Sequence, residues 1–259
     1  MPEGDTIFRA ARTLNEALAG RTVTRFDSVF SKLTRVDHDL PLRGRTIERV
    51  DARGKHLLIW FSGDLVLRTH MRMHGSWHIY REGERWQRPR FQARVEMHAD
   101  NGFVAVCFAG PVVEWLRDPG LDLGPDAASD GFDATEAVRR LQWLGDMPVE
   151  QALLEQRAIA GVGNVIKCEA LFVARVDPFA RVGGLPPESL ARLVEESHRL
   201  LVRDRSAGPR SSRPPGPRFW VYGRAFKPCL VCGEEIRLRR ASRITWFCPS
   251  CQRPIGAPR

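Results

Sequence analysis

The chain has 259 residues, 43% hydrophobic and 27% charged, so it is long enough to bury a core and to divide into two or three domains. No apolar run approaches the ~18 residues of a membrane helix, and the start lacks signal-peptide features, which predicts a cytoplasmic protein. The net charge of +9 predicts an anionic partner, most commonly nucleic acid, although only four of the forty basic residues are lysines and an arginine excess also accompanies GC-rich genomes.

The chain begins with Met1, Pro2 and Glu3. Removal of Met1 would leave the secondary amine of proline at the N-terminus, beside a carboxyl group. An α-amino group titrates near ~7.7 to 8, so part of it is neutral at cytosolic pH. Such an amine can attack an aldehyde-like carbon to give an iminium ion, while Glu3 moves protons. Pro2 and Glu3 are therefore candidate catalytic residues, although many chains begin with Met-Pro.

The pattern over residues 5–19 predicts an amphipathic helix, because apolar residues recur at helical spacing before Gly20. After it, β-branched and aromatic runs alternate with Gly, Asp and Asn turns. Six short strands at this spacing favour an antiparallel sandwich. The predicted strands are 22–30, 46–52, 56–61, 64–69, 91–97 and 103–108.

From about residue 134 the pattern becomes helical and indicates a second domain. The predicted helices are 137–144, 148–157, 165–173 and 187–202. Residues 203–218 follow, with five arginines and little that can pack. This composition predicts a mobile loop, with a solvated linker as the alternative.

Four of the six cysteines form two Cys-x2-Cys pairs that are separated by fifteen residues. This spacing predicts one structural Zn²⁺ per chain, bound at a β-hairpin by four thiolates that leave no open position for water. The ligands are Cys229, Cys232, Cys248 and Cys251. Cys107 and Cys168 lie in apolar surroundings and are expected to be buried, reduced thiols. Arg243 and other arginines between the two pairs suit a DNA backbone, with a solvated hairpin as the alternative.

A glycine turn, Gly161-Val162-Gly163, precedes Asn164 and a helical stretch. We expect Asn164 at the N-cap position. The free backbone N–H groups of such a junction can hold a phosphate, and Lys167 in the first helical turn adds positive charge. Glycine turns before helices are common, so this motif is weak when taken alone.

Four motifs, taken in order, resemble the formamidopyrimidine-DNA glycosylase and endonuclease VIII family: Pro2-Glu3-Gly4, Arg53-Gly54-Lys55, the glycine turn and the four-cysteine ribbon. The start Glu3-Gly4-Asp5-Thr6 is similar to the endonuclease VIII branch, and the arginine-rich composition is similar to an actinobacterial member. The resemblance implies an α+β multidomain protein: a catalytic β-sandwich with an N-terminal helix (1–125), a helix-two-turns-helix domain (126–222) and a zinc ribbon (223–259).

The resemblance also implies roles for single residues. Pro2 attacks C1′ of a nucleotide flipped out of the duplex, Glu3 moves protons, and Lys55 contacts the phosphate beside the lesion. Asn164 and Arg243 grip phosphates around the flipped nucleotide.

The segment 70–75 aligns with the wedge of the family, where side chains fill the space left by the extruded base. We expect Arg72, Met73 and His74 to intercalate, with ordinary core packing as the alternative for Met73.

The implied function is that of a bifunctional DNA glycosylase and apurinic/apyrimidinic lyase of base excision repair, a hydrolase and lyase that cuts the strand by β,δ-elimination. Residues 108–116 lack the arginine-phenylalanine pair of enzymes specialised for 8-oxoguanine, and 203–218 differ from their capping loop, so oxidised pyrimidines are favoured. We expect a monomer at the nucleoid that binds damaged DNA, without a membrane or an organic cofactor.

Two alternatives remain open at this point. A non-enzymatic, zinc-dependent protein that binds damaged DNA would use the same residues without chemistry, as it would if Met1 were retained. A zinc-ribbon transcription or RNA-processing factor would explain the charge and the cysteines but leave the N-terminus unexplained.

Overall fold

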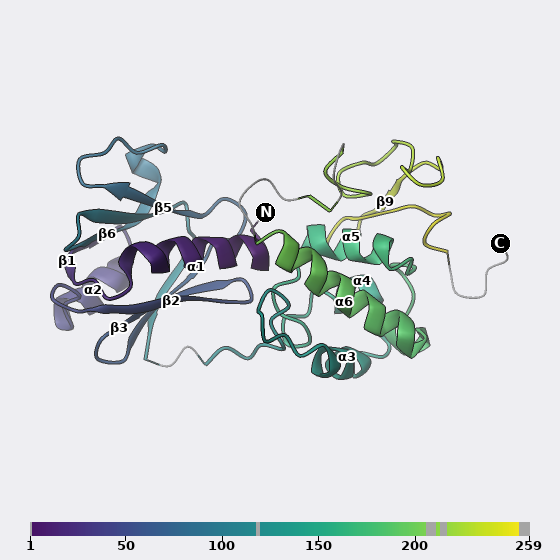
Figure 1. The fold of residues 1–259 in the computed structure, drawn as a ribbon, viewed down its shortest axis with the longest axis horizontal. Helices are drawn as coiled ribbons and strands as arrows, with labels where there is room; N and C mark the ends of the chain where they lie inside the picture. Colours follow the sequence, from purple (N-terminus) through teal and green to yellow (C-terminus); the bar gives the residue numbers. More distant parts are fainter. Residues whose placement is uncertain (1, 118–119, 206–210, 213–216, 254–259) are drawn as a thin grey trace. The chain divides into compact units, whose positions relative to one another are not determined.

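The computed structural model describes residues 2–117, 120–205, 211–212 and 217–253 (Figure 1). They fall into two units, Met1–Leu121 and Asp122–Arg259. The finer division into three domains stays a prediction. None of the helices in the described ranges is long and apolar enough to span a bilayer.

The first unit begins with helix α1, Gly4–Leu18, as the apolar spacing predicted. Its apolar stripe is buried. The helix lies against strands of both sheets of this unit (Figure 1). The stripe consists of Ile7, Ala11, Leu14 and Leu18. On the helix, the Asn15 Oδ1 accepts a hydrogen bond from the backbone N–H of Val50 at 2.8 Å, which ties α1 to the second strand.

Two antiparallel four-stranded sheets enclose the core of this unit, which confirms the predicted sandwich. One sheet has the order β1-β6-β7-β5 and the other β2-β3-β4-β8. The strands of the first are β1 (Val23–Ser28), β6 (Ala93–Ala99), β7 (Phe103–Phe108) and β5 (Ser76–Arg81). Those of the second are β2 (Ile47–Arg53), β3 (His56–Phe61), β4 (Leu65–His70) and β8 (Val112–Leu116).

Three elements of this unit were not predicted: α2 (Ser31–Asp39), β5 and β8. Helix α2 has only two apolar residues, Leu33 and Val36, of which Leu33 alone is buried, so the sequence gives too few positions to predict a helix. Strand β5 buries only Trp77 and Tyr80, which do not alternate along the strand, and β8 fully buries none of its side chains, so neither shows the period of two that predicts a strand. Strand β6 begins at Ala93 because a single 3₁₀ turn, η1 (Arg90–Gln92), occupies the start of the predicted 91–97 strand.

The second unit is built from four α-helices among its described residues, with the 3₁₀ turn η2 (Val182–Gly184) before the last. The helices are α3 (Ala134–Gln142), α4 (Val149–Ala152), α5 (Asn164–Val173) and α6 (Pro187–Arg203). Helix α4 is shorter than predicted, since the chain turns after Ala152. Helix α5 is central and buried on nearly all sides, and the predicted apolar stripe of α6 is buried against the same core.

The cysteine segment forms the predicted hairpin, with β9 (Arg237–Arg239) antiparallel to β10 (Thr245–Phe247). Strand β10 contacts α5, and a small apolar cluster that includes Cys168, Phe172 and Ile236 joins the hairpin to that helix. Cys107 and Cys168 are buried as expected, and burial raises the pKa of the Cys107 thiol to about 12. In the predicted mobile loop, residues 206–210 and 213–216 lie outside the described residues.

Candidate functional site

Pro2 and Glu3 stand directly before the first turn of α1. The backbone carbonyl of Glu3 accepts hydrogen bonds from the N–H groups of Thr6 at 2.9 Å and Ile7 at 3.1 Å. The Glu3 side chain is fully buried, whereas Pro2 is half-buried. The first turn of α1 therefore holds the Glu3 backbone, and Pro2 precedes it by one residue.

Lys55 occupies the tip of the β2–β3 hairpin. The last pair of this ladder joins Arg53 to His56, so the connection is the two-residue turn Gly54-Lys55. Gly54 has a φ of 57°, and glycine is favoured at the first position of such turns because it reaches positive φ without steric strain. The Arg-Gly-Lys motif is thus a hairpin turn that presents a lysine.

Two histidines flank this turn, since His56 and His70 form a cross-strand pair of β3 and β4 with ring centroids 5.0 Å apart. Burial, assisted by His70 and Arg68, lowers the pKa of His56 to about 4. Burial, assisted by Arg72 and Lys55, lowers the pKa of His70 to about 4 as well. Both rings are neutral at neutral pH.

The segment 71–75, which we call the wedge turn, connects β4 to β5. Met71 is buried, and its carbonyl accepts the N–H of Gly75 at 2.9 Å. A Cβ atom on Gly75 would lie 2.6 Å from that carbonyl oxygen, so the turn requires glycine. The three predicted intercalating side chains, Arg72, Met73 and His74, are all exposed, and Met73 is 56% exposed.

The glycine turn of the second unit is held by a residue that the sequence analysis did not single out. The Gln156 Oε1 accepts the N–H of Gly161 at 3.1 Å, and its Nε2 donates to the carbonyls of Leu154 at 2.9 Å and Val162 at 3.1 Å. Gly161 has a φ of 88°. The N-cap of α5 is Gly163, so Asn164 is the first helical residue and not the cap we expected.

Asn164 and Lys167 both donate hydrogen bonds to the β9–β10 hairpin. The Asn164 Nδ2 lies 3.0 Å from the carbonyl oxygen of Ile244, and the Lys167 Nζ lies 3.4 Å from the same atom. The Lys167 Nζ also donates to the Thr245 Oγ1 at 2.7 Å and lies 3.8 Å from the Glu150 carboxylate. Lys167 is fully buried, which differs from the solvent-facing position expected for a phosphate contact.

Arg243 immediately precedes this shared carbonyl group and is exposed on the turn between β9 and β10. The same contacts that bury Lys167 therefore bring Asn164 beside the turn that carries Arg243. Within the second unit, the structure unites the glycine turn and the hairpin arginine, which are about eighty residues apart in the chain.

Glu169 is a second buried group that sequence reasoning missed. Its carboxylate accepts three backbone N–H groups, from Trp220 at 2.8 Å, Val221 at 3.0 Å and Tyr222 at 2.9 Å, and the hydroxyl of Ser212. Burial raises the pKa of Glu169, and these hydrogen bonds oppose the shift. An acidic residue within the apolar stretch of α5 is the signal that could have revealed it.

The four cysteine sulfur atoms converge on one point. Three Sγ–Sγ distances are 3.9 Å, 3.5 Å and 3.5 Å, and all four atoms lie within 4.8 Å of one another. Sulfur atoms around a tetrahedral zinc ion lie about 3.8 Å apart when each bond is about 2.3 Å. The cluster can therefore hold a metal ion and has the form of a zinc-finger hairpin.

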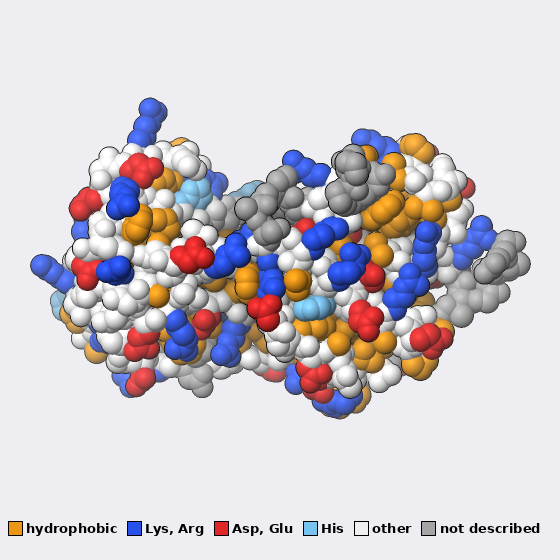
Figure 2. Space-filling model, in the orientation of Figure 1, with side chains coloured by type: hydrophobic (Ala, Val, Ile, Leu, Met, Phe, Trp, Pro, Cys, Tyr) orange, Lys and Arg blue, Asp and Glu red, His pale blue; other side chains and the backbone are white. Residues whose placement is uncertain are grey.

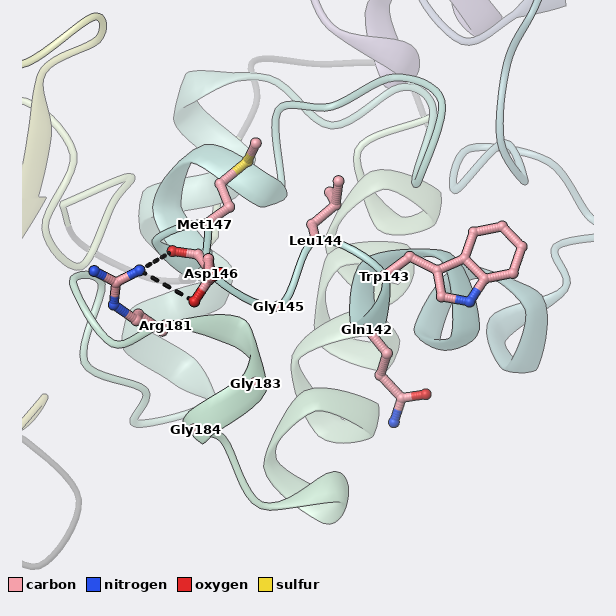
Figure 3. A pocket seen from close by; sticks show the side chains of 9 residues that line it. All are labelled: Gln142, Trp143, Leu144, Gly145, Asp146, Met147, Arg181, Gly183 and Gly184. Carbon is pink, nitrogen blue, oxygen red and sulfur yellow. Dashed lines mark hydrogen bonds and ion pairs between the residues drawn. The ribbon is translucent and has the colours of Figure 1, made fainter.

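Other features of the described residues lie apart from these groups. A cavity of about 780 Å³ in the second unit is lined by Trp143 and by the ion pair of Arg181 with Asp146 (Figure 3), and it contains none of the predicted site residues. Asp27, Glu96 and His98 form a half-exposed group whose carboxylates already pair with Arg25 and Arg90. Acidic side chains lie among the basic ones on the visible face (Figure 2), so net charge alone does not locate a site.

Comparisons with known proteins agree with this geometry. Residues 1–110 match the model of the formamidopyrimidine-DNA glycosylase N-terminal domain, and residues 123–211 match that of the H2TH domain of the same proteins. The probable endonuclease 8 2 of Streptomyces coelicolor is 40% identical over 265 residues, which cover 97% of this chain and 94% of that protein. The DNA-(apurinic or apyrimidinic site) lyase Nei2 of Mycolicibacterium smegmatis is 37% identical over 262 residues, which cover 97% and 99%.

A solved structure gives the same fold. The formamidopyrimidine-DNA glycosylase of Lactococcus lactis, determined with DNA that contains an abasic site, superposes with a TM-score of 0.82 at 22% identity and covers 97% of this chain and 100% of its own. The two domain matches lie within residues 1–211, and the identity to the relatives extends over 97% of the chain. The chain therefore belongs to the formamidopyrimidine-DNA glycosylase and endonuclease 8 family, on its endonuclease 8 branch and among its actinobacterial-like members.

Proposed function

We propose that this protein is a bifunctional DNA glycosylase and apurinic/apyrimidinic lyase that removes oxidised bases, with pyrimidines favoured. The observation that carries the proposal is the Pro2–Glu3 pair, fixed at the start of α1 with the Glu3 carboxyl group buried. The names of the relatives as endonuclease 8 and as an abasic-site lyase support this assignment.

The proposed reaction begins when the Pro2 nitrogen, freed by removal of Met1, forms a bond to C1′ of a flipped nucleotide and the bond to the base breaks. Glu3 gives a proton to the ring oxygen, the sugar opens, and an iminium ion forms. Loss of a proton from C2′ then expels the 3′ phosphate, and loss of a proton from C4′ expels the 5′ phosphate. Water hydrolyses the remaining iminium ion and restores the amine.

The remaining site residues bind DNA in this proposal. Lys55 meets the phosphate beside the lesion from its hairpin turn, and Asn164 and Arg243 grip phosphates around the flipped nucleotide. Arg72, Met73 and His74 enter the space that the base leaves. We assign Lys167 a supporting role, because its buried ammonium group donates a hydrogen bond to Thr245 in the hairpin that carries Arg243.

We infer that the four cysteines hold one Zn²⁺ ion, which supplies structure and no chemistry because four thiolates leave no open position. The ion would stabilise the hairpin that presents Arg243. We further infer that the protein acts as a monomer on damaged DNA at the nucleoid, in the cytoplasm, without an organic cofactor.

The preference for oxidised pyrimidines rests on the turn between β7 and β8. It is formed by Ala109, Gly110 and Pro111, and it lacks the arginine-phenylalanine pair of the enzymes specialised for 8-oxoguanine. Excision from duplexes that each carry one lesion, thymine glycol or 8-oxoguanine, measures the preference. Faster excision of 8-oxoguanine would contradict it.

Borohydride trapping tests the mechanism. Protein whose intact mass shows loss of Met1 is mixed with duplex DNA that contains one abasic site, and borohydride is added. We expect a covalent adduct that peptide mapping places on Pro2. A variant with one additional residue before Pro2 is the matched control and should give no proline adduct. No adduct with correctly processed protein would overturn the proposed mechanism.

A further inference from the structure

Three segments of the first unit meet at one end of the sheet β1-β6-β7-β5. The registers pair Ser76 with Phe108 and Ala93 with Phe108, so β5 begins, β7 ends and β6 begins at the same end. The wedge turn leads into β5, and the turn 109–111 leaves β7. The 3₁₀ turn η1 leads into β6. These three segments are therefore neighbours in space.

Hydrogen bonds join the three segments directly. The N–H of Ala109 donates to the carbonyl of Gln92 at 2.8 Å. The Arg88 Nη1 donates to the carbonyl of His74 in the wedge turn at 3.2 Å and to the Ser76 Oγ at 2.9 Å. The segment 88–92 is thus attached to the wedge turn on one side and to the turn 109–111 on the other.

Phe91 in η1 is 78% exposed, although its backbone is fixed. Its carbonyl accepts a hydrogen bond from the Arg94 Nη1 at 3.2 Å, and the N–H of the next residue, Gln92, donates to Pro89 at 3.0 Å. The neighbouring Arg90 side chain pairs with the Glu96 carboxylate at 3.5 Å and stands over the Trp86 ring. A single exposed apolar residue needs no explanation by itself. This one lies on a hydrogen-bonded turn that Arg88 joins to the wedge turn.

The chemistry that fits an exposed aromatic ring beside the wedge turn is a nucleic-acid base, which stacks on such a ring with about 1–3 kcal/mol. Two strand spacings separate β5 from β6, about 10 Å, which is on the scale of a DNA groove. The wedge turn and η1 can therefore meet different strands of one duplex. The turn between them, Ala109-Gly110-Pro111, has no side chain larger than that of proline, so no long side chain of this turn competes with Phe91 for a base.

We propose that Phe91 stacks on a base of the strand opposite the lesion and makes the protein prefer duplex over single-stranded DNA. This inference rests on the proposed function, because the wedge turn defines where the lesion strand lies. The new contact comes from η1, which contains none of the site residues named above.

Binding to an uncleavable abasic analogue tests the proposal without any chemistry. The probes are a duplex with 2-aminopurine opposite the analogue and the same lesion strand alone. Phe91→Ala should weaken duplex binding about five- to 150-fold, the range that corresponds to the loss of one stacked base, and leave single-strand binding unchanged. The wild-type protein should quench 2-aminopurine in the duplex, and Phe91→Ala should not. Phe91→Tyr should restore both signals.

The matched control is Trp143→Ala, since Trp143 is an aromatic side chain of similar exposure, 71%, in the second unit. Equal duplex affinity and quenching in wild type and Phe91→Ala would overturn the inference, and so would equal loss on duplex and single strand. If the proposed mechanism fails, the wild-type protein gives no borohydride adduct, whereas these binding and fluorescence readouts stay informative.

Discussion

Two lysines of this protein, Lys55 and Lys167, stand in opposite environments. Lys55 is at the tip of a two-residue hairpin turn, where the backbone presents the side chain and neighbouring histidines are kept neutral. Lys167 is completely buried at the start of α5 and bonds Thr245 and Glu150. The same residue type thus stands half-buried on a hairpin turn in one unit and fully buried as an internal support in the other.

The comparison extends to the proposed site as a whole. Candidate residues of the first unit lie on turns and at the start of a helix, where the protein can offer them to a ligand. In the second unit, the buried side chains of Asn164 and Lys167 donate hydrogen bonds to the hairpin turn that carries the exposed Arg243. Changes in the first unit should therefore affect chemistry and contacts, and changes in the second should affect the stability of what carries Arg243.

Metal removal should have the largest effect and should be confined to the second unit. A structural zinc site of this kind contributes about 10–16 kcal/mol to folding. We expect a chelator to unfold residues 223–253 and lower DNA affinity, as followed by segment-resolved hydrogen exchange, while the sheets of the first unit stay protected. Unchanged exchange around Cys248 would show that the hairpin does not depend on a metal.

Glu3→Gln should lower the rate of base excision and leave DNA binding unchanged. Loss of a positioned proton carrier lowers the rate by about 10²–10⁴-fold. Base excision in single-turnover assays should fall by this amount, whereas affinity for an uncleavable abasic duplex should stay close to wild type. Glu16→Gln, an exposed carboxylate on the same helix, is the control and should be neutral. If Glu3→Gln lost DNA binding and base excision to the same extent, the proposed division of roles between the units would be wrong.

Lys167→Met and Lys55→Met compare the two lysines directly. Lys167→Met leaves the buried Glu150 carboxylate without its cation, so we expect about 3 kcal/mol of lost stability in thermal unfolding. Lys55→Met should leave stability unchanged and weaken DNA binding. The double variant Lys167→Met/Glu150→Gln should recover part of the loss. A stable Lys167→Met protein with a reduced salt dependence of binding would instead identify Lys167 as a phosphate contact.

Arg243→Ala should weaken DNA binding about equally for all sequences and reduce the salt slope by about 1, since one phosphate contact is lost. Titrations at several salt concentrations measure this change. Arg240→Ala on the same turn is the matched control, because both side chains are exposed. An identical slope change in the control would mean that general charge, and not the position beside Ile244, determines the effect.

A further effect concerns pH. His56 and His70 have pKa values lowered to about 4, so the unfolded chain binds these protons first as the pH falls below about 6.5. Their contribution to stability is full above that pH and is lost between pH 6.5 and 4. The melting temperature of the wild type should fall more steeply over this window than that of His56→Asn/His70→Asn. Exposed His38→Asn should not change the slope.

Local sequence patterns were sufficient to predict much of the structure of this protein. The spacing of apolar residues in α1, the glycine in the Gly54-Lys55 turn and the cysteine pairs each act over a few residues, so the sequence alone determined the first helix, the Lys55 turn and the metal-binding cluster. Strands β5 and β8 escaped prediction because buried and exposed side chains do not alternate along them.

Only the tertiary structure decided the burial of polar groups and the neighbours of exposed ones. Lys167 is internal because Thr245, far along the chain, folds back onto α5, and Glu169 is satisfied by backbone groups some fifty residues later. Phe91 became a candidate contact because strand register places it beside the wedge turn. Such long-range pairings arise from chain packing, whereas composition and periodicity report only on residues close in sequence.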